Sequence, residues 1–266
     1  VPTLNEFNNI SIITNSLINI LNQSQYKNTY KICIVDDNSK DGTNELLLNL
    51  KEKHSNIFDY IIRKNEKGLS SAIIYGFDKF PADYYIVTDA DIQYDLSIIP
   101  EMIRMALEEE KEIVIANRML KNDNFKWKKS LKYKISRVGF NITKFLIKKD
   151  LPEDILTGFF MVNNNFYNRV KSKLSLVGFK ILLDFFLSSS IKVNYGEVYS
   201  YFKSREIGES KMDFSILCDF IYMIFINILK FNKKLVRYIV YLMINMPSFI
   251  FLFISFVSIL NLNINP

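Results

Sequence analysis

The amino-acid sequence predicts an α/β fold, in which a mostly parallel sheet is flanked by helices and followed by segments that associate with a membrane. Between residues 31 and 118, short apolar runs alternate with helical patterns. Alternation of this kind builds βαβ units, whose strands are parallel and buried. The second observation is an uncharged apolar run at 238–262, which is long enough to cross a bilayer. The 266 residues suffice for one large domain with an appendage.

The predicted elements follow one another through short connections. Strands are recognised as short runs of branched and aromatic residues, and helices as apolar residues three or four positions apart. In order, we expect strand 31–37, helix 43–54, strand 59–65, helix 69–80, a central strand 83–90, helix 96–110 and strand 112–118.

Polar residues stand at the ends of three of these strands. They are Asp36–Asp37, Asp89–Asp91 and Asn117–Arg118. In parallel sheets, ligands bind beyond the carboxyl ends of the strands. The coincidence therefore predicts a binding site at this edge of the sheet.

The segment TDADIQYD, residues 88–95, is the most specific part of this predicted site. If the strand stays extended, Asp89, Asp91 and Gln93 point to the same face. Two carboxylates on one face repel each other unless a cation or a proton lies between them. Mg²⁺ and Mn²⁺ bind one or two carboxylates and fill their remaining positions with phosphate oxygens and water. A solvated strand end is the alternative, and the polar ends of the neighbouring strands favour the metal site.

The segment VDDNSKDGT, residues 35–43, indicates a nucleotide contact. Asp41 or Thr43 is expected to cap the helix that follows. One of the two acids at the strand end, Asp36 or Asp37, is expected to face the crevice, where a carboxylate can accept hydrogen bonds from a base or a ribose. The sequence has no Gly-rich phosphate loop of the Walker or dinucleotide type. A bound diphosphate is therefore expected to rest on the metal.

The composition excludes some classes of site. One His, His54, and two Cys, Cys33 and Cys218, exclude a conventional zinc site and argue against a His-based catalytic triad. The two cysteines match no motif, which fits a reducing compartment. The net charge of +6 favours anionic partners. The sequence opens on VPTLNE, and no signal peptide is expected.

Residues 121–149 form a strongly basic stretch, with ten Lys or Arg and one acid. Apolar residues, among them Leu131, Ile135 and Val138, recur through it at three- and four-residue spacing. The pattern predicts an amphipathic basic helix that binds an anionic membrane surface. A nucleic-acid face is the alternative, but the nearby transmembrane candidate disfavours it, and we predict no nucleic-acid partner.

The run at 238–262 predicts a transmembrane helix with a kink at Pro247. A buried core helix is the alternative, but core helices are rarely so long and so uniformly apolar. The apolar stretch at 214–229 is shorter and is expected to lie in the membrane interface. Basic residues precede the run and no charge follows it, which places the preceding domain on the cytoplasmic side by the positive-inside rule. These basic residues are Lys230, Lys233, Lys234 and Arg237.

Six segments occur in the order typical of family 2 glycosyltransferases of the polyprenyl-phosphate type, and the chain resembles that family over residues 1–212. The resemblance implies a GT-A (Rossmann-like) fold, an inverting mechanism and a divalent metal, Mg²⁺ or Mn²⁺. It divides the chain into a GT-A catalytic domain at 1–212, an interface helix with a basic linker at 213–236, and a transmembrane segment at 237–266. The six segments are VPTLNE (1–6), VDDNSKDGT (35–43), TDADIQYD (88–95), DILTGFF (154–160), GFKILLDFF (178–186) and REIGESKM (205–212).

The resemblance also implies roles for individual residues, carried over position by position. The donor nucleotide would contact Pro2, Glu6, Val35, Asp37, Asp89 and Ala90. The metal would be held by Asp89, Asp91 and Gln93. The catalytic set would be Asp91, Arg118, Lys132, Ser136, Arg205 and Lys211, of which Arg118, Lys132 and Ser136 would meet the acceptor phosphate. The sequence departs from the family in Lys132 for Arg, Thr157 for Ser, and QYD (93–95) for QHP.

The activity implied is transfer of a hexose from a nucleotide sugar to a polyprenyl (dolichyl) phosphate. Mannose from GDP-mannose is the leading donor, and glucose from UDP-glucose is the alternative. The acceptor phosphate is already an oxyanion, so no base is needed to deprotonate it. A processive polysaccharide synthase is disfavoured because its Q-x-x-R-W motif is missing and the only Trp is Trp127. A non-catalytic, membrane-tethered lipid-binding protein is the remaining alternative, which the intact metal and basic residues disfavour.

Overall fold

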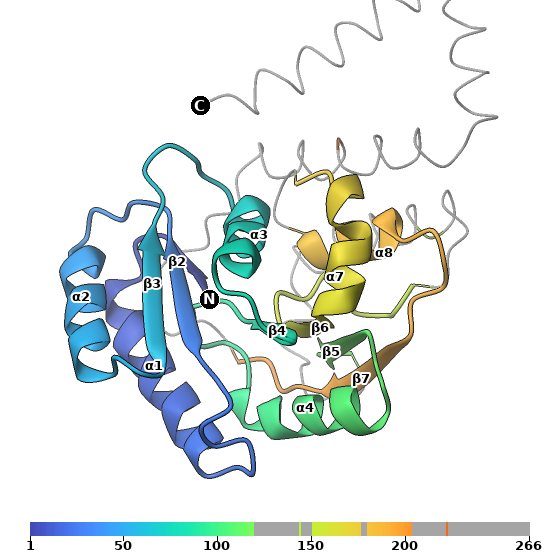
Figure 1. Ribbon diagram of the computed structural model, residues 1–266, viewed down its shortest axis with the longest axis horizontal. Helices are drawn as coiled ribbons and strands as arrows, with labels where there is room; N and C mark the ends of the chain where they lie inside the picture. Colours follow the sequence, from blue (N-terminus) through green and yellow to red (C-terminus); the bar gives the residue numbers. More distant parts are fainter. Residues whose placement is uncertain (120–143, 145–150, 177–179, 204–221, 223–266) are drawn as a thin grey trace, which may run out of the picture.

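The computed structural model of the chain describes residues 1–119, 144, 151–176, 180–203 and 222. Within them, helices lie on both faces of two small sheets (Figure 1). Apart from single residues, the basic stretch at 121–149 and the apolar segments at 214–229 and 238–262 lie outside the described residues. In the part of the chain that is described, no helix is both long and apolar enough to cross a membrane.

Every strand and helix predicted between residues 31 and 118 is present, with its ends displaced by at most three residues. The first of these are β2 (Ile32–Asp36), α2 (Thr43–Lys53), β3 (Phe58–Ile62), α3 (Leu69–Lys79) and β4 (Tyr84–Val87). The predicted helix at 96–110 is a 3₁₀ turn, η1 (Leu96–Ile98), that leads into α4 (Ile99–Glu108), and β5 (Ile113–Asn117) follows. The remaining elements are β1 (Pro2–Thr3), α1 (Phe7–Asn22), β6 (Phe160–Asn163), α7 (Asn164–Val170), η3 (Lys171–Lys173), α8 (Ile181–Ser188) and β7 (Tyr195–Tyr199).

The strands form two sheets, with the orders β1-β2-β3 and β4-β6-β5-β7. The pairs β1–β2, β2–β3 and β5–β7 are parallel, as the strand–helix alternation predicts. Strand β6 is the exception, because it runs antiparallel to both β4 and β5. The prediction that the strand at 83–90 is central is wrong, since β4 stands at the end of its sheet.

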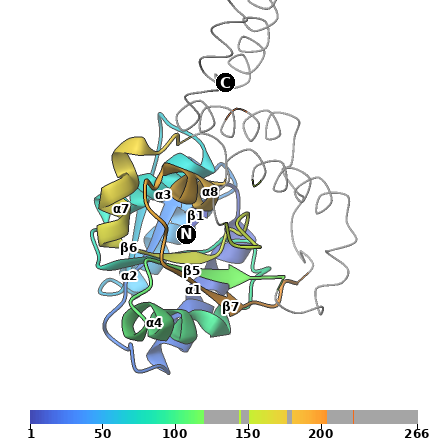
Figure 2. The ribbon, with the colours of Figure 1, turned by 90° about the vertical axis from the view of Figure 1, so that its right-hand side faces the viewer.

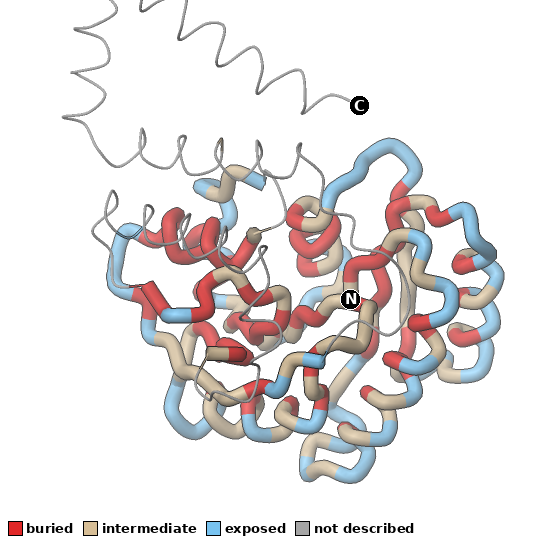
Figure 3. Tube along the Cα trace, turned by 180° about the vertical axis from the view of Figure 1, so that it is seen from behind, coloured by how far each residue is buried: buried red, intermediate tan, exposed pale blue. Residues whose placement is uncertain are grey.

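The two faces of the sheets are covered by different helices. Figure 2 shows α4 on one side of β5 and β7, and α3, α7 and α8 on the other. Alternate residues of β5 supply the two cores: Ile113 and Ile115 pack with α3, α7 and α8, whereas Val114 and Ala116 pack with α1, α2 and α4. This period of two is what a strand buried on both faces requires. Figure 3 shows buried residues along the strands and inner helix faces, with exposed residues in the outer loops.

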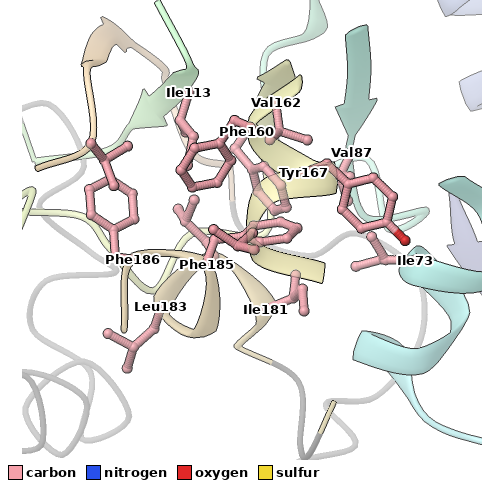
Figure 4. Close-up of a cluster of buried hydrophobic side chains, with 14 of the residues drawn as sticks. Ile73, Val87, Ile113, Phe160, Val162, Tyr167, Ile181, Leu183, Phe185 and Phe186 are labelled. Carbon is pink, nitrogen blue, oxygen red and sulfur yellow. The ribbon is translucent and has the colours of Figure 1, made fainter. Parts of the chain in front are cut away.

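The first core is rich in aromatic side chains, several of which Figure 4 shows meeting between the sheet and α8. Phe160 and Phe185 meet edge to face with ring centroids 6.1 Å apart, a geometry that aromatic pairs favour. Every residue of α8 is buried, including Asp184. The Asp184 carboxylate accepts hydrogen bonds from the Ser175 backbone (2.7 Å) and hydroxyl (2.8 Å), so its charge is satisfied within the core.

Candidate functional site

The acidic segment after β4 is a turn and not an extended strand. Strand β4 ends at Val87, and the chain turns at Ala90–Asp91. The next residue, Ile92, has a φ of +57°, a conformation that a β-branched side chain rarely adopts. The prediction that strand alternation aligns Asp89, Asp91 and Gln93 is therefore wrong. A strained turn presents these side chains instead, and such strain is often found at functional sites.

The residues after this turn pair with the segment that follows β7. The Gln93 side chain donates to the carbonyl of Lys203 (3.0 Å), and the Lys203 backbone N–H donates to the carbonyl of Gln93 (2.8 Å). Tyr94 forms an isolated antiparallel bridge with Phe202. The acidic turn, which follows β4 directly, is thereby fixed to residues 201–203, which are distant in sequence.

Gly158 lies directly against the carboxylate of Asp89. A Cβ atom added to Gly158 would stand 2.3 Å from Oδ2 of Asp89 and 2.9 Å from its carboxyl carbon. Real Cβ atoms do not approach other atoms so closely, so only glycine fits here. The segment DILTGFF therefore forms the wall behind the first acid of the turn.

A buried ion pair lies beside this wall. Asp154 accepts hydrogen bonds from the Arg118 backbone N–H (2.8 Å), from Nε (2.8 Å) and from Nη2 (2.7 Å). The Arg118 guanidinium also lies over the rings of Phe202 (4.9 Å) and Tyr94 (5.8 Å). Burial disfavours the charge on Arg118, but Asp154 and other groups, among them Asp89, together outweigh it and raise the pKa of the guanidinium. Arg118, predicted to meet the acceptor phosphate, is thus a fixed cation whose fork is held by Asp154.

Lys180 is a second cation in this cluster, and sequence reasoning gave it no role. Its Nζ donates to the carbonyl of Leu156 (3.0 Å), two residues before Gly158. Burial lowers the pKa of Lys180 to about 8, and Arg118 adds to the effect, whereas Asp89 and Asp154 oppose it. The only signal for Lys180 in the sequence is its place in the segment GFKILLDFF (178–186).

The acids at the end of β2 have different partners. Ser39 donates its backbone N–H to Asp36 (2.7 Å), so Asp36 shapes the turn after the strand. Asp37 accepts from Nε of Arg63 (2.6 Å) and from the backbone N–H of Gly68 (2.8 Å). Arg63 is 4% exposed and follows β3 directly. Sequence reasoning missed Arg63, although a charged residue at a strand end was the signal used for the other strands.

Asp41 links the first turns of two helices. One carboxylate oxygen accepts from the backbone N–H of Phe7 (3.0 Å) at the start of α1. The other accepts from the backbone N–H (3.2 Å) and the hydroxyl (2.6 Å) of Thr43 at the start of α2. The helix begins at the predicted place, but its N-cap residue is Gly42 and not Asp41 or Thr43. The structure adds the contact of Asp41 with α1. Gly42 takes a φ of +91°, which glycine adopts without strain.

The other residues predicted to contact the donor nucleotide lie in or beside β1, in β2 and in the acidic turn. Pro2 pairs with Val35, and both are buried. Glu6 occupies the N-cap position of α1 and accepts from the Asn9 side chain (2.8 Å). Ala90 is buried within the acidic turn.

A cavity of about 800 Å³ lies between β2 and β4. Its lining is mainly apolar, and the acids of the predicted site are not part of it. Pro2 and Val35 line it together with Thr88, the residue before Asp89. The ends of β1, β2 and β4 therefore border one space, although the polar chemistry lies outside this cavity.

The model for the family described as Glycosyl transferase family 2 matches residues 1–170. The chain belongs to glycosyltransferase family 2. The resemblance drawn from the six sequence segments is therefore confirmed at the level of the family.

Several relatives of this family 2 glycosyltransferase are called dolichol-phosphate mannosyltransferase. The chain is 32% identical over 220 residues to the one from Pyrococcus furiosus, covering 80% of this chain and 58% of that protein. It is 30% identical over 195 residues to the one from Mycosarcoma maydis, covering 73% and 65%, respectively. It is 26% identical over 228 residues to the one from Saccharomyces cerevisiae, covering 83% and 82%. The chain thus spans less than two thirds of the first two relatives.

Solved structures establish the fold of this family 2 glycosyltransferase as GT-A-like. A mannosyltransferase from Pyrobaculum calidifontis, in complex with GDP-Man and Mn²⁺, superposes with a TM-score of 0.55 at 13% identity, covering 83% of this chain and 61% of that one. Glucosyl-3-phosphoglycerate synthase from Mycobacterium tuberculosis, in complex with Mn²⁺ and UDP-glucose, superposes with a TM-score of 0.57 at 12% identity, covering 84% and 77%. The predicted GT-A (Rossmann-like) fold is confirmed.

The oxygen ligands that the acidic turn of this family 2 glycosyltransferase offers suit a hard divalent cation. The acidic turn offers the carboxylates of Asp89 and Asp91, which are ligands that Mg²⁺ and Mn²⁺ accept. Among the described residues, no group of three or more His, Cys, Asp or Glu could enclose a metal ion. Two carboxylates leave coordination positions open, as a cation shared with a diphosphate requires.

Four predicted catalytic residues of the family 2 glycosyltransferase lie outside the described residues, and their roles stay predictions. They are Lys132, Ser136, Arg205 and Lys211.

Proposed function

We propose that this family 2 glycosyltransferase transfers a hexose, mannose from GDP-mannose, to a polyprenyl (dolichyl) phosphate with inversion at the sugar. The observation that carries the proposal is the acidic turn at Asp89–Asp91, which lies beside the buried cation Arg118 and the partly buried Lys180. This arrangement suits a reaction between two anions. The names of the three relatives support mannose and dolichyl phosphate as the substrates.

The chemistry needs positioning and charge more than proton transfer. An acceptor phosphate oxygen attacks C1 of the hexose, the bond from C1 to the donor diphosphate breaks, and the nucleoside diphosphate leaves with the electron pair. No proton has to move, because the attacking oxygen is already ionised. Fixed cations hold the two anions together, and pre-organised charge of this kind is a major source of rate enhancement. Arg118 suits this task because Asp154 fixes its orientation.

In the proposed site, Asp89 and Asp91 hold a divalent metal, Mg²⁺ or Mn²⁺, with Gln93 as a further ligand. A bound metal supplies neutralisation of the charge that develops on the leaving diphosphate. Two structures with the same fold contain Mn²⁺ together with a nucleotide sugar, which supports this assignment.

We further propose that the protein acts at a membrane, with its catalytic domain on the cytoplasmic side. The basic stretch at 121–149 and the apolar segments at 214–229 and 238–262 would bring the site to the lipid phosphate. The support for this proposal is the pattern of the sequence.

Transfer of labelled hexose into a lipid-extractable product tests the proposal. The protein is given dolichyl phosphate with GDP-mannose or UDP-glucose, and with Mn²⁺ or a chelator. Metal-dependent transfer from GDP-mannose that is lost in Asp91→Ala is the expected result. Asp59→Ala is the matched control, because Asp59 pairs with Lys31 and Lys51 away from the site. Transfer from UDP-glucose alone would replace the donor, and folded protein that binds the lipid without transferring either sugar would favour the non-catalytic alternative.

A further inference from the structure

Tyr94 follows the acidic turn and is buried among three separate segments. The side chain is 5% exposed. Its ring packs edge to face on Phe159 (5.3 Å) and on Phe202 (4.9 Å). The position is one at which the sequence departs from the family, with Tyr in place of His.

The phenol oxygen of Tyr94 ties the acidic turn to the wall behind it. It accepts hydrogen bonds from the hydroxyl of Thr157 (3.0 Å) and from the backbone N–H of Gly158 (2.9 Å). Burial raises the pKa of the phenol above its ordinary value.

Gly158, in turn, determines where Asp89 can lie, since a Cβ there would stand 2.3 Å from the Asp89 carboxylate. Two contacts therefore link both ends of the segment 89–94 to Gly158. The Tyr94 phenol accepts a hydrogen bond from the Gly158 N–H, and Gly158 packs against the Asp89 carboxylate. The strained residue Ile92 lies within this segment. A strained turn persists only when surrounding contacts hold it, and the phenol supplies such a contact.

We propose that Tyr94 is a positioning residue for the metal site, whose phenol oxygen holds the Thr157–Gly158 backbone against Asp89 and so fixes the acidic turn. The inference rests on the proposed function in one respect, the metal that Asp89 and Asp91 bind. It adds a residue that contacts neither the metal nor a substrate and acts through Gly158.

The test is the affinity for Mn²⁺ in the presence of GDP, measured by titration with the electron paramagnetic resonance signal of free Mn²⁺. Tyr94→Phe keeps the ring and removes the acceptor of two buried donors. The loss of such an acceptor is expected to raise the Mn²⁺ dissociation constant about fivefold or more. Thr157→Val removes one of the two hydrogen bonds and is expected to have a smaller effect in the same direction.

Tyr85→Phe is the matched control, since Tyr85 is also a buried tyrosine whose hydroxyl is hydrogen-bonded. Its hydroxyl donates to the carbonyl of Phe77 (3.2 Å) and accepts from the N–H of Ala82 (3.3 Å), in the core between α3 and β4. Thermal unfolding shows whether each variant is folded. The control is expected to lose stability and to keep its Mn²⁺ affinity.

Unchanged Mn²⁺ affinity in both Tyr94→Phe and Thr157→Val would overturn the inference, and so would an equal loss in Tyr85→Phe. The assay of hexose transfer separates this outcome from a failure of the proposed function. Mn²⁺ binding that follows the expected pattern, without transfer of any hexose, would refute the function and leave the role of Tyr94 standing. A wild-type protein that binds no Mn²⁺ would overturn both.

Discussion

At the scale of single residues, Gly158 constrains the position of Asp89 because it has no side chain. Its Cα packs on Asp89 so closely that an added methyl group would lie 2.3 Å from a carboxylate oxygen. We predict that Gly158→Ala displaces Asp89 and lowers metal-dependent transfer at least about tenfold, because misplacement by about an ångström at a reacting centre has effects of this size. The measurement is kcat/KM at saturating Mn²⁺.

Gly196→Ala provides the control for this prediction. A Cβ at Gly196 would also stand 2.3 Å from another atom, but that atom is the sulfur of Met105, near the end of a flexible side chain. The methionine can move aside, so transfer is expected to stay near the wild-type rate. Equal losses of activity in the two variants would contradict a specific role for Gly158.

The buried ion pair between Arg118 and Asp154 carries a second prediction at this scale. Removing one member of a buried pair leaves the other charge in a medium that solvates it poorly. Asp154→Ala is therefore expected to lower the free energy of unfolding by about 3–5 kcal/mol. Glu101→Ala removes an exposed partner of Arg104 and is expected to lower it by less than about 1 kcal/mol. Urea denaturation measures the free energy of unfolding of both variants. Similar losses would show that the buried pair contributes no more to stability than the exposed pair.

Residue identities were easier to predict than the contacts of those residues. The sequence pointed to Asp89, Asp91 and Asp37 because carboxylates are conspicuous at strand ends. It could not show that Asp37 holds Arg63, or that Lys180 lies near Asp89, because these partners are brought together only by the fold. The reason given for Asp89 and Asp91 was wrong as well, since a positive φ at the β-branched Ile92 is not expected from its sequence.

At the scale of secondary structure elements, hydrophobic periodicity determined what could be predicted. The elements between residues 31 and 118 were found because short β-rich runs and helical patterns differ clearly in period. Periodicity does not encode strand direction, so the antiparallel course of β6 and the end position of β4 were not predicted. Helix α8 is buried on all sides, so it shows no polar face from which its packing could be derived.

The start of α1 and the start of α2 share one acid, and this makes their stability depend on pH. Burial alone would raise the pKa of Asp41, but hydrogen bonds from Thr43 and Phe7 lower it below its ordinary value of 3.8. A lowered folded-state pKa gives stability that is present above the unfolded value and is lost as pH falls through the folded value.

Asp41→Ala is therefore expected to lower the free energy of unfolding by about 1 kcal/mol at neutral pH, because it removes hydrogen bonds from Phe7 and Thr43 to an exposed carboxylate. The difference from the wild type is expected to stay constant between about pH 5 and 7 and to narrow below pH 3.8. Urea denaturation followed by circular dichroism at several pH values measures it. Asp41→Asn is the control, because it keeps an acceptor without the charge. The difference in free energy of unfolding between Asp41→Asn and Asp41→Ala should not change with pH. A loss in Asp41→Ala, relative to the wild type, that is the same at every pH would contradict the lowered pKa of Asp41.

At the scale of the whole molecule, the candidate site draws on both sheets. The predicted nucleotide contacts, including Pro2, Val35 and Asp37, come from β1 and the end of β2, whereas the acidic turn follows β4 in the second sheet. A donor that spans the two sheets would therefore stabilise both halves together, while a ligand that contacts one half would stabilise the molecule less.

We predict that GDP with Mn²⁺ raises the midpoint of thermal unfolding by several degrees, and that either alone raises it less. A ligand present at 100 times its dissociation constant stabilises the folded state by about 2.7 kcal/mol, which corresponds to a shift of this size in a domain of about 200 residues. Asp91→Ala should keep the shift caused by GDP and lose the increment caused by Mn²⁺, because the substitution leaves Asp37, the predicted nucleotide contact, in place. Differential scanning fluorimetry measures the midpoint without ligand, with GDP, with Mn²⁺ and with both. If GDP alone gives the full shift in the wild type, Mn²⁺ adds no stabilisation, and the shared site is ruled out.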